Sequence, residues 1–190
     1  MNRKKQKTTQ KSGSVLASTQ HAAPPPTNAA EPSPADGVLE RALRHVSIGD
    51  HERALDLLTA AIKSPRNQNA RGVCLLRLGR TEAAIRVFRE LLLNPGSTWM
   101  RPDLPTVYKT NYATALLVGG HPSGCLEIIN EIRNEQHPSV QRLRRAIATW
   151  EASLSLWQRL NWRIGKIEPS GRPVQLDFPP GDFDEPATAT

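Results

Sequence analysis

The chain has 190 residues, with 25 Lys and Arg against 18 Asp and Glu and a net charge of +7. Its 2 Cys lack a CxxC spacing, which excludes a disulfide framework and a paired-cysteine metal site. No apolar run is long enough for a secretory leader or a membrane-spanning helix. We therefore expect a cytoplasmic protein.

Proline divides the chain into three parts. Five of the 16 prolines lie in residues 24–34 and five in residues 169–186. Residues 1–33 are basic and then Pro/Ala-rich, with too few large apolar side chains for a core, so we predict a disordered tail. The domain is expected at 34–165, followed by a Pro-rich acidic tail at 166–190. The basic excess lies on the domain, where it suits nucleic acid, anionic lipid or an acidic protein.

Three segments of the domain share one pattern of small and large residues. "GDHERALDLL", "GRTEAAIRVF" and "GHPSGCLEII" each begin with Gly, place a small residue five positions later and place large apolar residues eight and nine positions later. The small residues are Ala54, Ala84 and Cys125. Steps of three and four residues put these side chains on one face, so each segment is predicted to be an amphipathic helix.

A second helix is predicted before each Gly, because a small residue also stands seven positions upstream. Gly49, Gly79 and Gly120 then occupy the turn, where a left-handed backbone is easiest for glycine. The predicted helices are 35–47, 51–63, 66–78, 82–93, 105–118, 122–135 and 138–164, with an extended loop at 94–106. The predicted helix caps are Ser33, Asp50, Ser64 and Thr81.

This pattern resembles the tetratricopeptide repeat (TPR) family over roughly residues 35–135. "LGRTEAAIRVFRELLLNP" at 78–95 carries the family's Ala followed four residues later by Phe. The Gly-to-Gly spacings are 30 and 41 residues, whereas the repeat length of the family is about 34 residues. The alternative to a TPR protein is a different helical-hairpin solenoid. The resemblance implies an all-α, right-handed helical-hairpin solenoid of three TPR-like units.

The last predicted helix carries an apolar stripe, Leu143, Ile147, Trp150, Leu154 and Trp157. A repeat stack needs such a cap for its final apolar face, so we expect one long C-terminal capping helix with solvated arginines. The alternative is a surface for an anionic membrane or an acidic partner. That surface is formed by Trp157, Arg159, Trp162 and Arg163.

No motif for catalysis, a cofactor or a metal is found, so we predict a non-enzymatic protein. The resemblance implies a concave groove that binds a peptide or partner helix. The predicted groove residues are Leu39, Leu43, Arg66, Asn69, Val73, Arg77, Val107, Thr110, Asn111 and Thr114. Asn69 and Asn111 have side-chain amides suited to a peptide backbone, although both residues are also consistent with an ordinary solvated wall.

These observations predict a protein interaction module or scaffold with an unknown protein partner. Peripheral binding to an anionic membrane is the alternative. Nonspecific nucleic-acid binding is a weaker one, because the chain lacks interleaved aromatic and basic residues outside the last helix. For the C-terminal tail, the alternation of Val174, Leu176 and Phe178 fits either a strip lying on the domain or an exposed acidic peptide read by another protein.

Overall fold

The computed structural model describes residues 34–94, 96, 99–169 and 171–184. Within these ranges the secondary structure is all-helical, with eight helices and no strand. The predicted N-terminal tail and the Ser33 cap lie outside the described residues. The helices are α1 (Pro34–Ser47), α2 (His51–Ala60), α3 (Pro65–Arg77), α4 (Thr81–Leu92), α5 (Thr106–Val118), α6 (Pro122–Glu131), α7 (Pro138–Ser153) and α8 (Leu156–Gly165).

Three tight turns join α1 to α2, α3 to α4 and α5 to α6. Gly49, Gly79 and Gly120 occupy these turns with φ of 81°, 71° and 83°. The left-handed backbone is the conformation predicted for them, and it is cheap only for glycine. Asp50 and Ser64 cap α2 and α3 as expected, whereas Thr81 is already the first residue of α4 and Arg80 precedes it without a side-chain cap.

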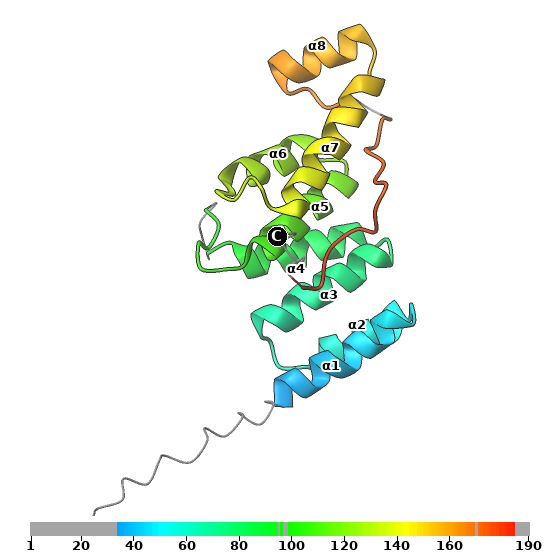
Figure 1. Cartoon of the computed structure of the whole chain (residues 1–190), viewed down its shortest axis with the longest axis vertical. Coiled ribbons are helices and arrows are strands. Elements are labelled where there is room, and N and C mark those ends of the chain that lie inside the picture. The colour runs from blue at the N-terminus through cyan, green and yellow to red at the C-terminus, as the bar shows by residue number, and fades with distance from the viewer. Residues whose placement is uncertain (1–33, 95, 97–98, 170, 185–190) are drawn as a thin grey trace, which may run out of the picture. The chain divides into compact units, whose positions relative to one another are not determined.

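Each helix packs on the next from α1 through α6, and the first helices of the hairpins also meet one another. Thus α1 contacts α3, α3 contacts α5, and α5 contacts α7 (Figure 1). The small residues of the repeated pattern, Ala54, Ala84 and Cys125, are all 0% exposed. All three are therefore packing positions, where a larger side chain would separate two helices.

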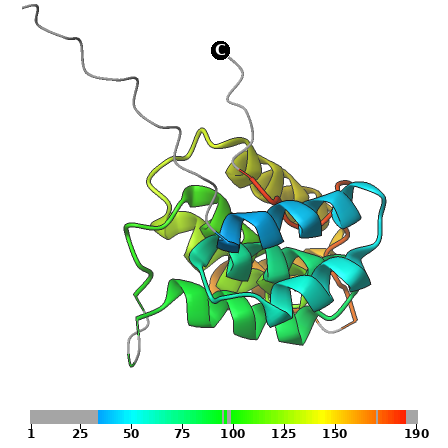
Figure 2. The ribbon, with the colours of Figure 1, turned by 90° about the horizontal axis from the view of Figure 1, so that it is seen from below.

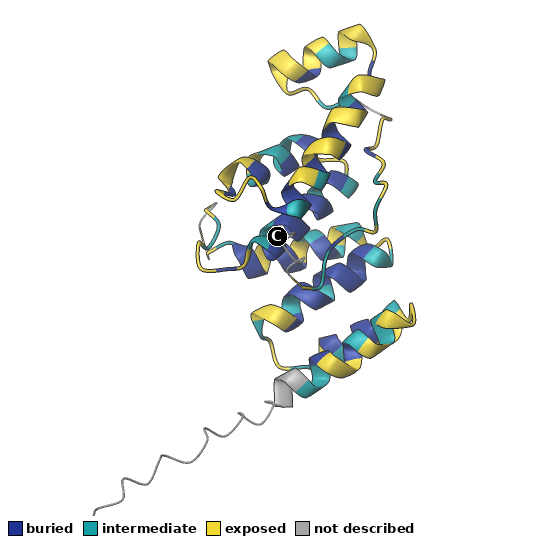
Figure 3. Ribbon diagram, in the orientation of Figure 1, coloured by how far each residue is buried: buried dark blue, intermediate teal, exposed yellow. Residues whose placement is uncertain are grey.

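Two apolar clusters form the core. One joins α1 to α5 around Phe88 and Leu92, and the other joins α5 to α8 around Leu143 and Trp162. Buried residues follow the faces between neighbouring helices, while α8 is largely exposed (Figure 3). Each cluster also contacts the C-terminal segment, through Phe183 in the first and Val174 in the second.

The prediction of one long capping helix over 138–164 is wrong. The helix ends at Ser153, and α8 starts after Ser155, whose side chain forms a capping box with Gln158. The rings of Trp150 and Trp162 lie 5.1 Å apart, whereas 12 residues of continuous helix would separate them by about 18 Å. The break therefore allows Trp162 to fold back and become buried.

Candidate functional site

The C-terminal segment, residues 171–184, returns along α7 and ends against α3 and α5 (Figures 1 and 2). Of the two interpretations of this tail, the structure shows the strip lying on the domain. Trp150 Nε1 donates a hydrogen bond of 2.7 Å to the carbonyl oxygen of Arg172, and Val174 is buried beside it. The guanidinium of Arg142 lies 5.0 Å from the ring centre of Phe178.

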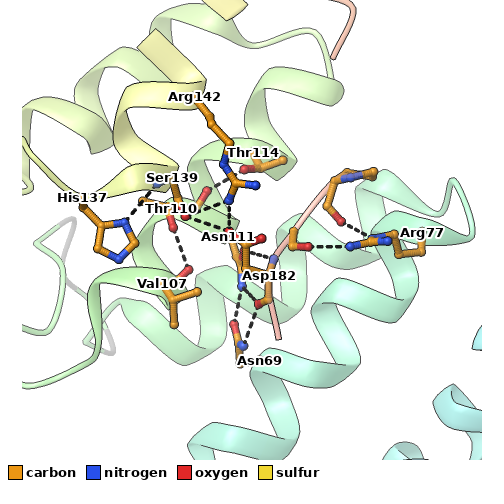
Figure 4. A network of polar contacts seen from close by, with 12 residues as sticks. Asn69, Arg77, Val107, Thr110, Asn111, Thr114, His137, Ser139, Arg142 and Asp182 are labelled. Atoms are coloured by element: carbon orange, nitrogen blue, oxygen red, sulfur yellow. Dashed lines mark hydrogen bonds and ion pairs between the residues drawn. The ribbon is translucent and has the colours of Figure 1, made fainter. Parts of the chain in front are cut away.

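Asp182 lies at the centre of a polar network between α3, α5 and α7 (Figure 4). Its backbone N–H donates to Asn111 Oδ1 over 2.8 Å, and its carbonyl oxygen accepts from Asn111 Nδ2 over 2.7 Å. One amide side chain thus bonds both main-chain groups of one residue, as a neighbouring β-strand would. Such contacts bind a peptide regardless of its side chains.

Asn69 fixes the orientation of Asn111 and extends the contact by one residue. Its Oδ1 accepts a bond of 2.8 Å from Asn111 Nδ2, and its own Nδ2 donates to the carbonyl oxygen of Phe183 over 3.3 Å. Asn69 and Asn111 are each 1% exposed. A buried amide is costly when it is unpaired. The hydrogen bonds between the two asparagines and the segment therefore stabilise both the helices and the bound segment.

Arg77, at the end of α3, binds the preceding turn of the segment. Its Nε and Nη2 donate to the carbonyl oxygens of Pro180 and Gly181 over 2.7 and 2.9 Å. Burial lowers the pKa of Arg77, and the negative charge of Asp182 opposes that shift. Burial also lowers the pKa of nearby His51, with a smaller contribution from the charge of Arg77. The positive charge of this end of the site is therefore carried by arginine.

The carboxylate of Asp182 binds to the start of α7. Oδ2 accepts a bond of 2.7 Å from Ser139 Oγ and forms an ion pair with Arg142. The side chains of Arg142 and Asp182 are 30% and 24% exposed, so the pair is screened less than a surface pair. Arg142 also donates to Ser139 Oγ over 3.0 Å. Charge-assisted bonds of this kind select an acidic side chain.

The structure brings together only part of the predicted groove. Asn69, Arg77 and Asn111 bond the segment, and Val73 packs against Gly181. Of the others, Leu39 is in the core, Leu43 is partly buried against it, and Arg66 is exposed in the first turn of α3. The side chains of Val107, Thr110 and Thr114 are buried, and both hydroxyls donate to carbonyl oxygens within α5.

Sequence reasoning missed Ser139 and Arg142: the arginines of the last predicted helix were assigned to its solvated face, and Ser139 was given no role. A signal was present, because Arg142 stands four residues after the Pro138 that opens α7, as Asn69 stands four after Pro65. The same position in two helices that each begin with proline points to one surface. What the pattern lacked was the acidic partner, which lies 40 residues farther along the chain.

The predicted surface on the last helix needs one correction. Trp162 is 0% exposed and its Nε1 donates to Glu151 Oε1 over 2.6 Å, so it is not a surface residue. Arg159 donates to the carbonyl oxygens of Glu151 and Ala152 at the end of α7, and Arg163 pairs with Glu151. Trp157 is 76% exposed and therefore does not take part in the predicted closing stripe.

No protein-family profile matches the chain, and neither a curated protein nor a solved structure matches it. Within the described ranges, no helix combines the length and apolar character needed to cross a bilayer. The same residues contain no group of three or more His, Cys, Asp or Glu arranged to hold a metal ion.

Proposed function

We propose that this protein is a non-enzymatic interaction module that binds a peptide segment of a partner protein between α3, α5 and α7. The architecture in this proposal is a right-handed, TPR-like solenoid. Its support is the series of glycine-turned hairpins, the equal burial of Ala54, Ala84 and Cys125, and the contacts among the first helices.

The main support for the proposal is the pair of hydrogen bonds between the Asn111 side chain and the main chain of Asp182. A side chain that merely filled space in a helical core would not need to bond both peptide groups of an extended segment. The remaining contacts also go largely to carbonyl oxygens, those of Pro180, Gly181 and Phe183. A site that reads the main chain can accept a segment from another protein.

A catalytic role has no place in this proposal. Burial raises the pKa of the Cys74 thiol and of the Cys125 thiol to about 12 each. At neutral pH both are protonated, and a protonated thiol is a poor nucleophile. The polar side chains around Asp182 are engaged in holding the segment rather than in activating a water or a hydroxyl.

A peptide library tests the proposal. The full chain with Asp182→Arg, which sets a cation against Arg77 and Arg142 and so releases the segment, is used to select phage-displayed random peptides. We expect peptides to be enriched, and we expect their affinity to fall at least tenfold when Asn111→Ala is added. A tenfold loss corresponds to the free energy of about one hydrogen bond.

The matched control is Asn130→Ala, on the exposed side of α6, which should leave binding unchanged. Thermal melts of each variant show that the domain is folded. If folded Asp182→Arg protein enriches no peptide, or if the enriched peptides bind equally well without Asn111, the groove is not a peptide-binding site.

Anionic membrane binding through α8 is the second candidate. Leu156, Trp157 and Ile164 are 83%, 76% and 77% exposed on one helix, and residues 138–173 hold seven Arg or Lys against two Glu. An apolar face with a basic surround fits an anionic lipid surface. Sedimentation with vesicles of phosphatidylcholine, with and without phosphatidylserine, tests this candidate. Trp157→Ser should abolish the binding that requires phosphatidylserine. Ile48→Ser, at another exposed apolar residue, should not.

A further inference from the structure

The site between α3, α5 and α7 demands more of its ligand than an extended main chain. Residues 180–183 read Pro-Gly-Asp-Phe, and each contributes a contact with the domain. Arg77 binds the first two carbonyl oxygens, the amide pair binds the third residue, and Phe183 packs on the first apolar cluster. The order of these contacts defines a short recognition sequence.

Glycine is required at the second position. Gly181 has a φ of 81°, in the left-handed region that other residues adopt at a cost. A Cβ built on Gly181 would lie 3.1 Å from both Cγ atoms of Val73, which is itself 0% exposed. Any side chain there would push the segment away from α3 and lengthen its bonds to Arg77.

An acidic residue is required at the third position, and the ligand must continue beyond it. Ser139 and Arg142 contact the Asp182 carboxylate directly, and the ion pair with Arg142 favours an acidic side chain at this position. Asn69 bonds the carbonyl oxygen of Phe183, after which the chain goes on to Asp184. The site therefore suits an internal turn rather than a C-terminal carboxylate.

The occupied turn and the rest of the segment have largely different contacts, although Arg142 contacts both. Arg172 to Phe178 lie on α7 through the bond from Trp150, the burial of Val174 and the stacking of Phe178 under Arg142. Residues 180–183 instead depend mainly on polar bonds, with an Asp182 side chain that is 24% exposed. The turn can leave the groove while the strip on α7 stays in place.

We propose that this site takes an internal Pro-Gly-Asp-Phe turn from a partner protein, and that residues 180–183 are its intramolecular competitor. The inference rests on the proposed function and adds the ligand's sequence and its regulation. A tethered competitor acts at a high effective concentration, so the free chain is closed to weak ligands. A partner that carries the same turn, or presents several, opens it.

The test uses a fluorescent peptide of residues 176–184, LDFPPGDFD, with both ends blocked. Anisotropy is measured with the full chain carrying Asp182→Arg as receiver, and with the unaltered chain. We expect saturable binding to the receiver and at least tenfold weaker binding to the unaltered chain, because only the latter holds a matching turn in the groove.

Peptide variants test the sequence requirement. Asp182→Asn and Gly181→Ala in the peptide should each weaken binding at least tenfold, since one loses the charged bonds and the other forces Val73 aside. Asp177→Asn is the matched control, because Asp177 is an exposed acid of the same segment, and it should change binding less than twofold. Equal binding of all four peptides would overturn the inference.

Hydrogen exchange of the unaltered chain gives a second measurement that does not depend on a receiver variant. Saturating peptide should raise exchange at the amides of residues 181–184 while leaving that of residues 174–178 unchanged. If exchange at these amides does not increase at any peptide concentration, the segment is a fixed part of the fold. That result would refute the proposal that a peptide displaces the turn. If the library enriches Asn111-dependent peptides without Gly-Asp, the proposed function stands and this inference alone fails.

Discussion

At the scale of single residues, one pair of asparagines joins α3 and α5 to the C-terminal segment. Asn111 uses both of its amide protons and its oxygen, bonding Asn69 and the two main-chain groups of Asp182. At 1% exposure this amide has all three of these hydrogen bonds made within the chain, and release of the segment would exchange the two bonds to Asp182 for bonds to water.

The close approach of α3 to α4 also depends on one residue. A Cβ at Gly72 would lie 2.5 Å from Cζ of the Phe88 ring, which is fully buried. Gly72→Ala should therefore lower the free energy of unfolding by about 1–3 kcal/mol, as overpacking does. Urea denaturation followed by tryptophan fluorescence measures the change.

The control for Gly72 is Gly37→Ala in α1, where nothing lies within 4 Å of the added carbon. Alanine has the higher helix propensity, so this change should stabilise the protein by up to about 1 kcal/mol. If both substitutions are stabilising, the Gly72–Phe88 contact is not the constraint that holds these helices together.

The two thiols give a prediction about reactivity. With a pKa of about 12 for both Cys74 and Cys125, caused mainly by burial, the thiolate fraction at neutral pH is roughly a thousandfold below that of an exposed cysteine. We expect iodoacetamide to label neither residue in the native chain within the time that labels both fully in urea. Mass spectrometry counts the adducts, and rapid native labelling of either thiol would contradict its burial.

Residue-scale features were predictable from sequence where the cause is local. A glycine seven residues after a small residue and five before another indicates a left-handed turn, and Gly49, Gly79 and Gly120 have that backbone. Asn69 and Asn111 were found by helix register. Ser139 and Arg142 were not, because their role depends on a carboxylate brought from a distant part of the chain, and register carries no information about such a return.

At the scale of elements, the end of the domain shows how periodicity can mislead. The stripe Leu143, Ile147, Trp150 and Leu154 is buried as predicted, but Trp157 continues its spacing and is exposed. The helix breaks because Ser155 and Gln158 form a capping box, and because Arg159 covers the carbonyl oxygens left free at the end of α7. Local capping outweighs a continued stripe.

Two tryptophans of α8 provide a matched test of this docking. Trp162 is the buried residue of α8 and contacts Trp150 and Glu151, whereas Trp157 points to solvent. Trp162→Ala removes a contact worth about 3–5 kcal/mol in buried positions, so α8 should detach and lose its protection from hydrogen exchange. Trp157→Ala should leave that protection intact.

Exchange in α1–α4 serves as the internal reference, since α8 contributes only to the second apolar cluster, which joins α5 to α8. A loss of protection confined to α8 identifies it as an independently opening unit. Equal loss throughout the domain in Trp162→Ala would show instead that α8 is required for the stability of the whole stack.

At the scale of the whole domain, the C-terminal segment links helices that are far apart in sequence. Its first half lies on α7, and its second half forms hydrogen bonds with α5 and α3. One segment of the chain therefore contacts all three of these helices. The alternation of Val174, Leu176 and Phe178 indicated that the tail could lie on the domain. Its destination could not be derived from the sequence, because composition gives neither the direction of a Pro-rich strip nor its register against a helix face.

The ion pair between Arg142 and Asp182, at the end of this path, is expected to limit how often the turn opens. Chymotrypsin cleaves after aromatic residues but not before proline, so Phe178 is resistant and Phe183, followed by Asp184, is the sensitive residue of the segment. Cleavage there requires the turn to leave the groove, and its rate follows the population of the open form. Arg142→Gln removes a charge-assisted bond, so cleavage after Phe183 should accelerate about tenfold.

Arg144→Gln is the control for this last measurement, since Arg144 is an exposed residue of the same helix whose 3.7 Å pair with Glu135 is open to solvent, and it should leave the rate unchanged. Added salt should narrow the difference between the unaltered chain and Arg142→Gln, because screening weakens a pair that is partly exposed. Mass spectrometry of the released C-terminal peptide gives the rate directly. Cleavage that is equally fast in all three chains would mean that Arg142 does not hold the turn, and the closed state would then have to rest on Asn69, Arg77 and Asn111 alone.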